Sequence, residues 1–424
     1  MRAGFSKQCI TPRNGTLMEG LSQRSPAQSI HDDLFVRALF LNHDGVEQVI
    51  LSFDLLFLDR GQVDRIKGAV GNVTGLCPAQ ILINFTHTHC SPRVTSWAYT
   101  GQIEEAYMNL VEAQAIGAVL GARESLRDVT LEAGTTTTDL PVNRRLPDAN
   151  GVAQWKPNFA GPVINDLPCC VLRDLERGDV ISVLFSVACH PSMIYEFAIS
   201  AEFPGAAVRH LNKHFATEGS LFLQGAAGDA KPRPGAGDGS RWVPCTWEQM
   251  EEVGAELAAK VIECSTTMAR IEPSLTAGLI EVPWHQEQTP RLEDLQKVIG
   301  STSEPVNRKA WATDMLAILE LRGGLIRNPG ILVHFIELGA GLRIVAIEGE
   351  VLARLGKRLM AEIPDGVTFL LGYSNGTAIY LPDRDDVTAG GYEVDSFWEY
   401  HKASAPAPDC DGPLVDSVHA HFSS

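Results

Sequence analysis

Short runs of branched and aromatic apolar residues recur along the chain, and most of them end at a polar residue. Runs of this length that are rich in β-branched side chains predict buried strands. They lie at residues 34–41, 48–53, 79–83, 180–185, 221–224, 342–347 and 367–371. Helical periodicity separates several of them, near residues 60–70, 103–123 and 246–261. This alternation predicts an α/β fold of mixed β-sheets flanked by helices.

Three local signals refine this outline. Asp44-Gly45 joins the first two strands as a hairpin turn, and Thr246 with Gln249 forms a capping box at the start of a helix. Residues 1–30 are interrupted by glycine and proline, so we expect loops there. The polar residues 284–328 show a helical pattern. We therefore expect one catalytic domain over residues 1–424, with a helical insertion at about 284–328.

Two histidines stand where the strand at 79–83 ends, in the segment Asn84-Phe85-Thr86-His87-Thr88-His89. In an extended chain, residues two apart point to the same face. His87 and His89 therefore suit a metal ligand beside a second ligand or a proton-transfer group. The alternative is a pair of polar loop residues that cap the strand.

Other strands end in groups of the same kind. His190 follows the strand at 180–185, and Glu350 follows the strand at 342–347. Asp229 and Lys231 follow the strand at 221–224, and Tyr380 follows the last strand. Each has an ordinary structural alternative, such as a hydrogen-bonded core histidine or a carboxylate in the first turn of a helix. Two histidines and a carboxylate with a vacant position, however, have the composition of a catalytic zinc site, placed here at strand C-terminal ends.

Several motifs in this order match one family. Thr86-His87-Thr88-His89-Cys90 looks like a Thr-His-Thr-His-Ser loop, and Ala188-Cys189-His190 looks like an Ala-Thr-His segment. Further similar motifs are Asn143-Arg144, Glu348-Gly349-Glu350-Val351, Gly372-Tyr373-Ser374-Asn375 with Tyr380, and Tyr392-Glu393. In these motifs the chain resembles the catalytic domain of neutral/alkaline ceramidases, zinc-dependent amidases that hydrolyse N-acyl sphingosine. The resemblance extends from residue 4 to about residue 400, and we expect the family's C-terminal immunoglobulin-like domain to be absent.

The resemblance implies a role for each matched residue. Zn²⁺ would be bound by four side chains, those of His87, His190, Glu350 and Tyr380. His89 would transfer protons beside the bound water, and Arg144 and Tyr392 would line the site. The attacked bond would be the C–N bond of an amide.

The chain departs from the family at residues that would contact the substrate. Lys231 stands where the family has a serine, and Ser91-Pro92-Arg93-Val94 replaces a Gly-Pro-Gly-Gly segment. The result is a group of cations near the predicted site: Arg93, Arg144, Arg145, Lys231 and Arg233. With Asp229 beside them, Lys231, Arg93 and Arg233 predict a small anionic substrate rather than a sphingolipid. The alternative is that some of them, such as Arg145 and Arg233, point to solvent.

Composition limits the kinds of partner that we expect this protein to bind. The net charge of −17 disfavours nucleic acid, which needs a basic surface. No apolar run is long enough to span a membrane, and the N-terminus lacks the apolar core of a signal peptide. Nine cysteines, an odd number, do not suggest a disulfide framework, so we expect a cytoplasmic location. The oligomeric state stays open, a homo-oligomer included.

Three functions fit these observations. The first is a zinc hydrolase acting on an amide, or less readily on an ester or lactone. The second is a zinc-assisted lyase, in which Lys231 or Tyr392 removes a proton next to a carboxylate. The third is a non-catalytic binding protein, which the joint presence of His87, His190, Glu350 and Tyr380 disfavours.

Overall fold

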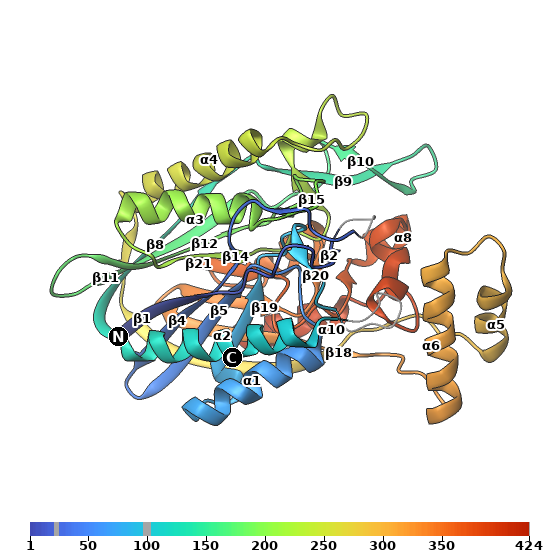
Figure 1. The fold of residues 1–424 in the computed structure, drawn as a ribbon, viewed down its shortest axis with the longest axis horizontal. Coiled ribbons are helices and arrows are strands. Elements are labelled where there is room, and N and C mark those ends of the chain that lie inside the picture. Colours follow the sequence, from blue (N-terminus) through green and yellow to red (C-terminus); the bar gives the residue numbers. More distant parts are fainter. Residues whose placement is uncertain (21–24, 96–102, 424) are drawn as a thin grey trace.

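Two β-sheets packed face to face form the centre of the computed structural model, which describes residues 1–20, 25–95 and 103–423 (Figure 1). The larger sheet has the order β14 (Ser220–Gln224), β12 (Val180–Val187), β11 (Asp166–Asp174), β8 (Arg127–Thr137), β1 (Arg2–Cys9), β4 (Phe35–His43), β5 (Val46–Phe53) and β6 (Ile81–Phe85), and β16 (Ala269–Ile271) pairs with β8. The smaller sheet has the order β17 (Pro273–Pro283), β18 (Gly330–Gly339), β19 (Leu342–Ile347) and β21 (Val367–Leu371).

Helices cover the outer faces of both sheets and complete a four-layer arrangement. In β4, Val36, Ala38 and Phe40 face the helices, whereas Leu39 and Leu41 face the other sheet, because successive strand residues point to opposite faces. The larger sheet is covered by α1 (Arg60–Thr74), α2 (Glu105–Glu124), α3 (Glu202–Phe215) and α4 (Trp247–Ser265). The smaller sheet is covered by α7 (Ala353–Ala361) and α10 (Gly412–Ser423). The predicted fold class, mixed sheets flanked by helices, is confirmed.

Short elements complete the chain around the ends of the long strands. The strands are β2 (Met18–Glu19), β3 (Ser29–Ile30), β7 (Ser91–Pro92), β9 (Pro141–Pro147), β10 (Ala153–Asn158), β13 (Ala198–Ile199), β15 (Ala230–Pro232), β20 (Glu350–Val351) and β22 (Tyr380–Leu381). The helices are α8 (Arg384–Ala389), α9 (Tyr392–Asp395) and the 3₁₀ turns Pro78–Gln80, Arg233–Ala236 and Ser396–Tyr400.

The expectation of loops over residues 1–30 is wrong for its first part. Strand β1 pairs residue by residue with β4, from Arg2 opposite Asn42 to Cys9 opposite Phe35. Residues of β1 are mixed in polarity and several are partly exposed, so no hydrophobic pattern predicts this strand from the sequence. The long apolar strand beside it supplies the hydrogen-bonding edge that orders it. The capping box of Thr246 and Gln249 is present at the start of α4, as predicted.

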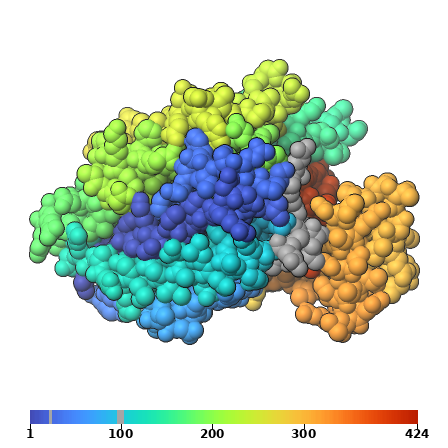
Figure 2. All heavy atoms as spheres, viewed as in Figure 1, coloured from blue at the N-terminus to red at the C-terminus, as the bar shows by residue number. Residues whose placement is uncertain are grey.

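Residues 284–328 contain two helices, α5 (Leu292–Gly300) and α6 (Val306–Arg322), as the polar helical pattern predicts. They share a small apolar cluster around Leu295, Trp311 and Met315, which is separate from the three cores of the layers. The pair stands to one side of the body, in orange (Figure 2). The single-domain organisation stays a prediction. Among the described residues, no helix combines the length and apolarity that a membrane crossing requires.

Asn84 ties together the strand ends on which the functional groups stand. The side chain is fully buried, and its Nδ2 donates to the carbonyl oxygen of Gly372 at 2.9 Å and to Ser374 Oγ at 3.0 Å. Its Oδ1 accepts the backbone N–H of Gln224 at 2.8 Å. One amide therefore joins β6, the end of β14 and the segment after β21.

Replacing this amide tests its contribution. We expect Asn84→Ala to lower the free energy of unfolding by about 1–3 kcal/mol, because it leaves the buried N–H of Gln224 without its acceptor, whereas the Gly372 carbonyl still accepts from Ser374 Oγ. Urea denaturation measures the change. Asn150→Ala, in an exposed turn, is the control and should stay within about 0.5 kcal/mol of wild type. Equal stability of the two variants would contradict the assignment.

Candidate metal centre

Three histidine rings meet at the ends of β6 and β12. One ligand nitrogen from each of His87, His89 and His190 lies within 4.8 Å of the other two. Glu350 in β20 approaches the same point, with Oε2 3.6 Å from His87 Nε2 and 3.2 Å from His190 Nε2. Strand β20 pairs in parallel with β22, where Glu350 lies opposite Tyr380. The structure thus brings together groups separated by up to about 290 residues of sequence.

The other ring nitrogen of each histidine is held by a backbone carbonyl. His87 Nδ1 donates to the carbonyl oxygen of Leu56 at 2.8 Å. In the same way, His89 Nδ1 donates to Gly20 at 2.7 Å, and His190 Nδ1 donates to Ala227 at 2.7 Å. A carbonyl can only accept, so Nδ1 carries the proton and Nε2 presents its lone pair to the centre. Burial lowers the pKa of all three imidazoles and keeps them neutral. Neutral rings fixed in this tautomer are what a metal cation requires.

Backbone strain accompanies the cluster. His87 has φ +62° and Tyr373 has φ +51°, a left-handed region that residues with a Cβ rarely adopt. Gly20, with φ +95°, meets His89 so closely that an added Cβ would lie 2.9 Å from His89 Cα. Such strain persists where the surrounding structure determines the geometry, and it gathers at functional sites.

Arg144 lies beside the centre and is 2 % exposed. Its Nε donates to Glu393 Oε1 at 2.7 Å, its Nη2 donates to the Tyr380 hydroxyl at 2.9 Å, and its Nη1 is 3.4 Å from His190 Nε2. Arg145 donates to the other oxygen of Glu393 at 2.5 Å and is also buried. The alternative that Arg145 points to solvent is therefore wrong, because Glu393 offsets the charge of both arginines.

Asp229 and Arg233, two of the predicted substrate contacts, do not lie where a substrate contact would be expected. Asp229 is fully buried, and its two oxygens accept from Ala353 N at 2.8 Å and Asn143 Nδ2 at 2.7 Å. We therefore assign Asp229 a structural role instead of the predicted substrate contact. The guanidinium of Arg233 is half exposed and donates to the carbonyl of Asp139, so this residue does face outwards. Burial raises the pKa of Asp229 to about 6.

Two further predicted residues, Lys231 and Tyr392, lie close to the centre, and a third, Arg93, follows a short strand. Lys231 in β15 is 6 % exposed, and its charge acts on His89 and His190. Tyr392 packs its ring edge-on against Tyr380 at 5.8 Å, and its hydroxyl donates to a glutamate, Glu399. Arg93 directly follows β7 and is partly buried.

The structure adds two tyrosines that the sequence analysis did not single out. Tyr400 donates to Glu350 Oε1 at 2.5 Å, and Tyr373 donates to Glu350 Oε2 at 3.2 Å. Both phenols are buried. Together they fix the rotation of the carboxylate, so that Oε2 faces His87 and His190. Tyr373 lies in the matched Gly372–Asn375 motif, and Tyr400 follows the Tyr392-Glu393 pair. Their closeness to these motifs was the only feature of the sequence that could have indicated a role at the centre.

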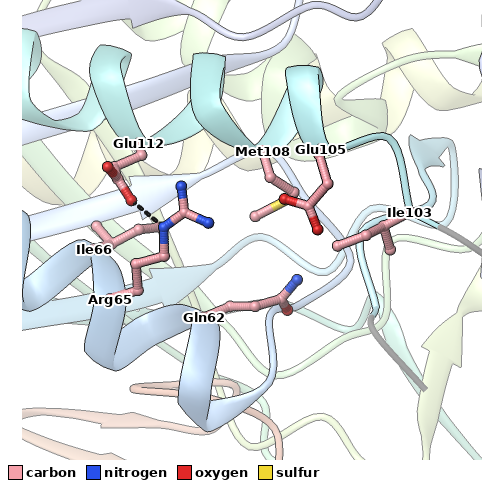
Figure 3. Close-up of a pocket in the computed structure, with 7 residues that line it drawn as sticks. All are labelled: Gln62, Arg65, Ile66, Ile103, Glu105, Met108 and Glu112. Atoms are coloured by element: carbon pink, nitrogen blue, oxygen red, sulfur yellow. Dashed lines mark hydrogen bonds and ion pairs between the residues drawn. The ribbon is translucent and has the colours of Figure 1, made fainter. Parts of the chain in front are cut away.

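A separate hollow of about 160 Å³ lies between α1 and α2 (Figure 3). Its lining includes Gln62, Met108 and the ion pair of Arg65 with Glu112 at 2.6 Å. None of the predicted metal or substrate residues lines it. The hollow is therefore not part of the candidate metal centre.

The architecture and the buried triad together define a protein with the fold of a neutral ceramidase and a site that can bind a metal. The crystal structure of the neutral ceramidase from Pseudomonas aeruginosa matches with a TM-score of 0.74 and 16% sequence identity, over 100% of this chain and 74% of that chain. A ceramidase complexed with C2 matches equally well, over 99% of this chain and 74% of that one. At this identity the likeness defines the fold. No family model and no curated protein sequence matches the chain.

The tyrosine pair generates a prediction about metal affinity. We expect Tyr400→Phe to weaken metal binding about 10–100-fold, with Zn²⁺ as the probe, because residues that orient a ligating group contribute this much. Competition with a chromophoric chelator measures the affinity. Tyr107→Phe removes a buried hydroxyl that donates to Ile10 O at 2.7 Å, outside the centre, and serves as the matched control. A loss no greater than that of the control would show that Tyr400 does not position Glu350.

Proposed function

We propose that the chain is a zinc-dependent hydrolase that cleaves an amide C–N bond in a small anionic substrate by means of an activated water. The observation that carries the proposal is the convergence of His87 and His190 Nε2 on Glu350 Oε2, at 3.6 and 3.2 Å. Two neutral imidazoles and one carboxylate form a ligand set typical of catalytic zinc. The fold of a neutral ceramidase supports the choice of an amide over other bonds.

The residues present fit the ion. Imidazole nitrogens favour zinc over magnesium or calcium, which prefer oxygen ligands throughout. Tyr380 lies opposite Glu350 in the pair of β20 and β22, and Arg144 contacts both the Tyr380 hydroxyl and His190 Nε2. We therefore assign His87, His190, Glu350 and Tyr380 as the ligands. When bound there, zinc supplies a Lewis acid that polarises a carbonyl and acidifies the attacking water.

His89 is assigned the proton transfer. Its Nε2 is buried and has no hydrogen-bond partner among the described residues, while Nδ1 is held by Gly20. Among the ion pairs of the described residues, Glu350 contacts His87 and His190 but not His89, which leaves His89 to face the reactants. A neutral imidazole in this position can take a proton from the water and return it to the leaving amine.

Arg144 and Tyr392 complete the surroundings of the reacting bond. Arg144 holds the Tyr380 hydroxyl at 2.9 Å and is itself held by Glu393, so its charge is fixed in position. A fixed positive charge stabilises the oxygen on which negative charge develops. Tyr392 packs edge-on against Tyr380 and is 38 % exposed, and we assign it to the outer wall of the site.

Lys231 supports an anionic substrate. No carboxylate lies within 4.0 Å of its Nζ among the described residues, although the side chain is buried. Desolvation and the neighbouring Arg144 lower the pKa of Lys231 to about 8. A carboxylate or sulfate on the substrate would supply the missing counter-charge.

The same pKa supports a second candidate, a zinc-assisted lyase. Near pH 8 a large fraction of Lys231 is a neutral amine, which can abstract a proton next to a carboxylate. Turnover in heavy-oxygen water separates the two reactions. Hydrolysis of an amide, ester or lactone places one solvent oxygen in the acid product, whereas elimination places none.

The metal assignment predicts different outcomes for the histidines. His87→Ala and His190→Ala should lose most of the zinc, because each removes a ligand. His89→Ala should keep its zinc and lose about 10²–10⁴-fold in rate, the usual range for a general acid or base. Elemental analysis together with activity measures both properties. Loss of zinc from His89→Ala as complete as from His87→Ala would make His89 a ligand and overturn its assigned role.

The substrate assignment predicts that Lys231→Ser weakens kcat/KM for an acidic substrate by about 10–100-fold and leaves the zinc content unchanged. Because the ammonium must be charged to hold the anion, wild-type KM for that substrate should rise as the pH passes above about 8. The serine variant should lack this rise. Efficient cleavage of a long-chain ceramide by the wild type would contradict the assignment.

A further inference from the structure

Three aromatic rings surround the ammonium of Lys231. The distances from Nζ to the ring centroids are 5.9 Å for Trp155, 5.5 Å for Tyr195 and 5.6 Å for Trp242. We call these four residues the lysine cluster. Lys231 and Trp155 come from the outer strands of one small sheet, β10-β9-β15 (Figure 1). Ring faces attract a cation, so the three rings offset part of the cost of burying the ammonium without a carboxylate.

The lysine cluster adjoins the metal centre. The guanidinium of Arg144 lies 4.1 Å from the Trp155 ring centroid, and Tyr392 packs edge-on against Trp155 at 5.0 Å. Arg144 in turn contacts Tyr380 and His190. A molecule bound at Lys231 would therefore lie next to the proposed reacting bond.

Two of the rings are open to solvent. Trp155 is 44 % exposed and Tyr195 is 40 % exposed, whereas Lys231 beneath them is 6 % exposed. Exposing one large aromatic ring is ordinary, but exposed rings gathered over a buried charge mark a site where a ligand covers them.

The cluster also contains donors that lack acceptors. Trp242 Nε1 is buried and has no hydrogen-bond partner among the described residues. The Lys231 ammonium has three donors, and the one hydrogen bond found for it goes to Tyr195 Oη at 3.3 Å. Glu202 acts on Lys231 through its charge but forms no ion pair with it within 4.0 Å. The Lys231 ammonium and the Trp242 indole N–H therefore both call for a ligand that supplies hydrogen-bond acceptors.

We propose that the lysine cluster is the subsite for the acidic end of the substrate, and that this end is an oxyanion carried on a flat ring. The oxygens accept from Lys231 Nζ and Trp242 Nε1, and the ring lies against Trp155 and Tyr195. An aromatic carboxylate is the simplest molecule with both features. The inference rests on the proposed function only for the identity of the molecule as substrate, since binding to the cluster needs no turnover.

An acyl chain fits the cluster poorly. A hydrocarbon would desolvate the ammonium and the indole N–H without offering either an acceptor, which is costly for buried polar groups. A small anion such as acetate would satisfy the donors but leave the two exposed rings uncovered. Only a ligand with both a ring and an oxyanion uses the whole cluster.

The test measures binding of benzoate to the metal-bound protein by tryptophan fluorescence and calorimetry. Benzamide has the same ring without the charge, and acetate has the charge without the ring. We expect benzoate to bind at least about 10-fold more tightly than either, because a charge-assisted hydrogen bond and a stacked ring each contribute severalfold. The titration is repeated after chelation, since a carboxylate can also bind a metal directly.

Variants locate the binding. Lys231→Met should weaken benzoate binding about 10–100-fold, and Trp242→Phe, which keeps the ring but removes the N–H, about 2–10-fold. Trp155→Leu should weaken benzoate about 2–10-fold and leave acetate unchanged. Lys156→Met, an exposed lysine beside Trp155 in β10, is the matched control and should bind as wild type does.

Several results would overturn the inference. They are equal binding of benzoate and benzamide, wild-type affinity in Lys231→Met, loss of binding on chelation, and no benzoate binding at all. Each is distinct from failure of the proposed function, which would appear as absent zinc or absent solvent oxygen in the product. A protein without zinc that still binds benzoate through Lys231 would sustain the subsite and refute the metal hydrolase.

Discussion

The arrangement of the centre follows from the cost of burying polar groups. Three imidazoles and a carboxylate lie among strand ends where little solvent reaches, so each must find a partner or pay a desolvation penalty of several kcal/mol. Carbonyl groups at Leu56, Gly20 and Ala227 satisfy one nitrogen of each ring. The remaining lone pairs point at one another and at Glu350, an arrangement that a cation stabilises.

A second set of buried ionisable groups lies beside the first. Glu393 accepts from Arg144 and Arg145 with one oxygen each, which fixes both guanidinium groups. Asp386 lies 3.5 Å from Arg145 as well. Breaking a buried network of this kind is costly, because it leaves an unpaired charge behind. The short helices that carry Glu393 and Asp386 are therefore held close to the centre, together with the tyrosines that contact Glu350.

The fold matches neutral ceramidase structures over the whole chain at 16% identity, and the groups that converge at the centre stand at the ends of its strands. The lysine cluster is different in kind, because it places a buried ammonium and exposed indole and phenol rings beside that centre. The shared fold therefore does not by itself determine which molecule binds beside the centre.

The sequence by itself determined the apolar strands β4, β5, β6, β12, β14, β19 and β21, several of the helices that cover the sheets, and the histidines that follow β6 and β12. It did not reveal the long strands β8, β11, β17 and β18, whose residues are more mixed in polarity or partly exposed. Apolar runs buried on both faces leave a strong signal, and a polar group directly after such a run is conspicuous. The tertiary structure alone decided which of the remaining polar residues meet. Strand β1 has no pattern of its own, and Asp229 and Arg145, expected near substrate or solvent, turned out to be internal partners of Asn143 and Glu393. Tyr400, Trp155 and Trp242 reach the centre or Lys231 from irregular or short segments distant in sequence, where contacts depend on three-dimensional packing and no local periodicity reports them.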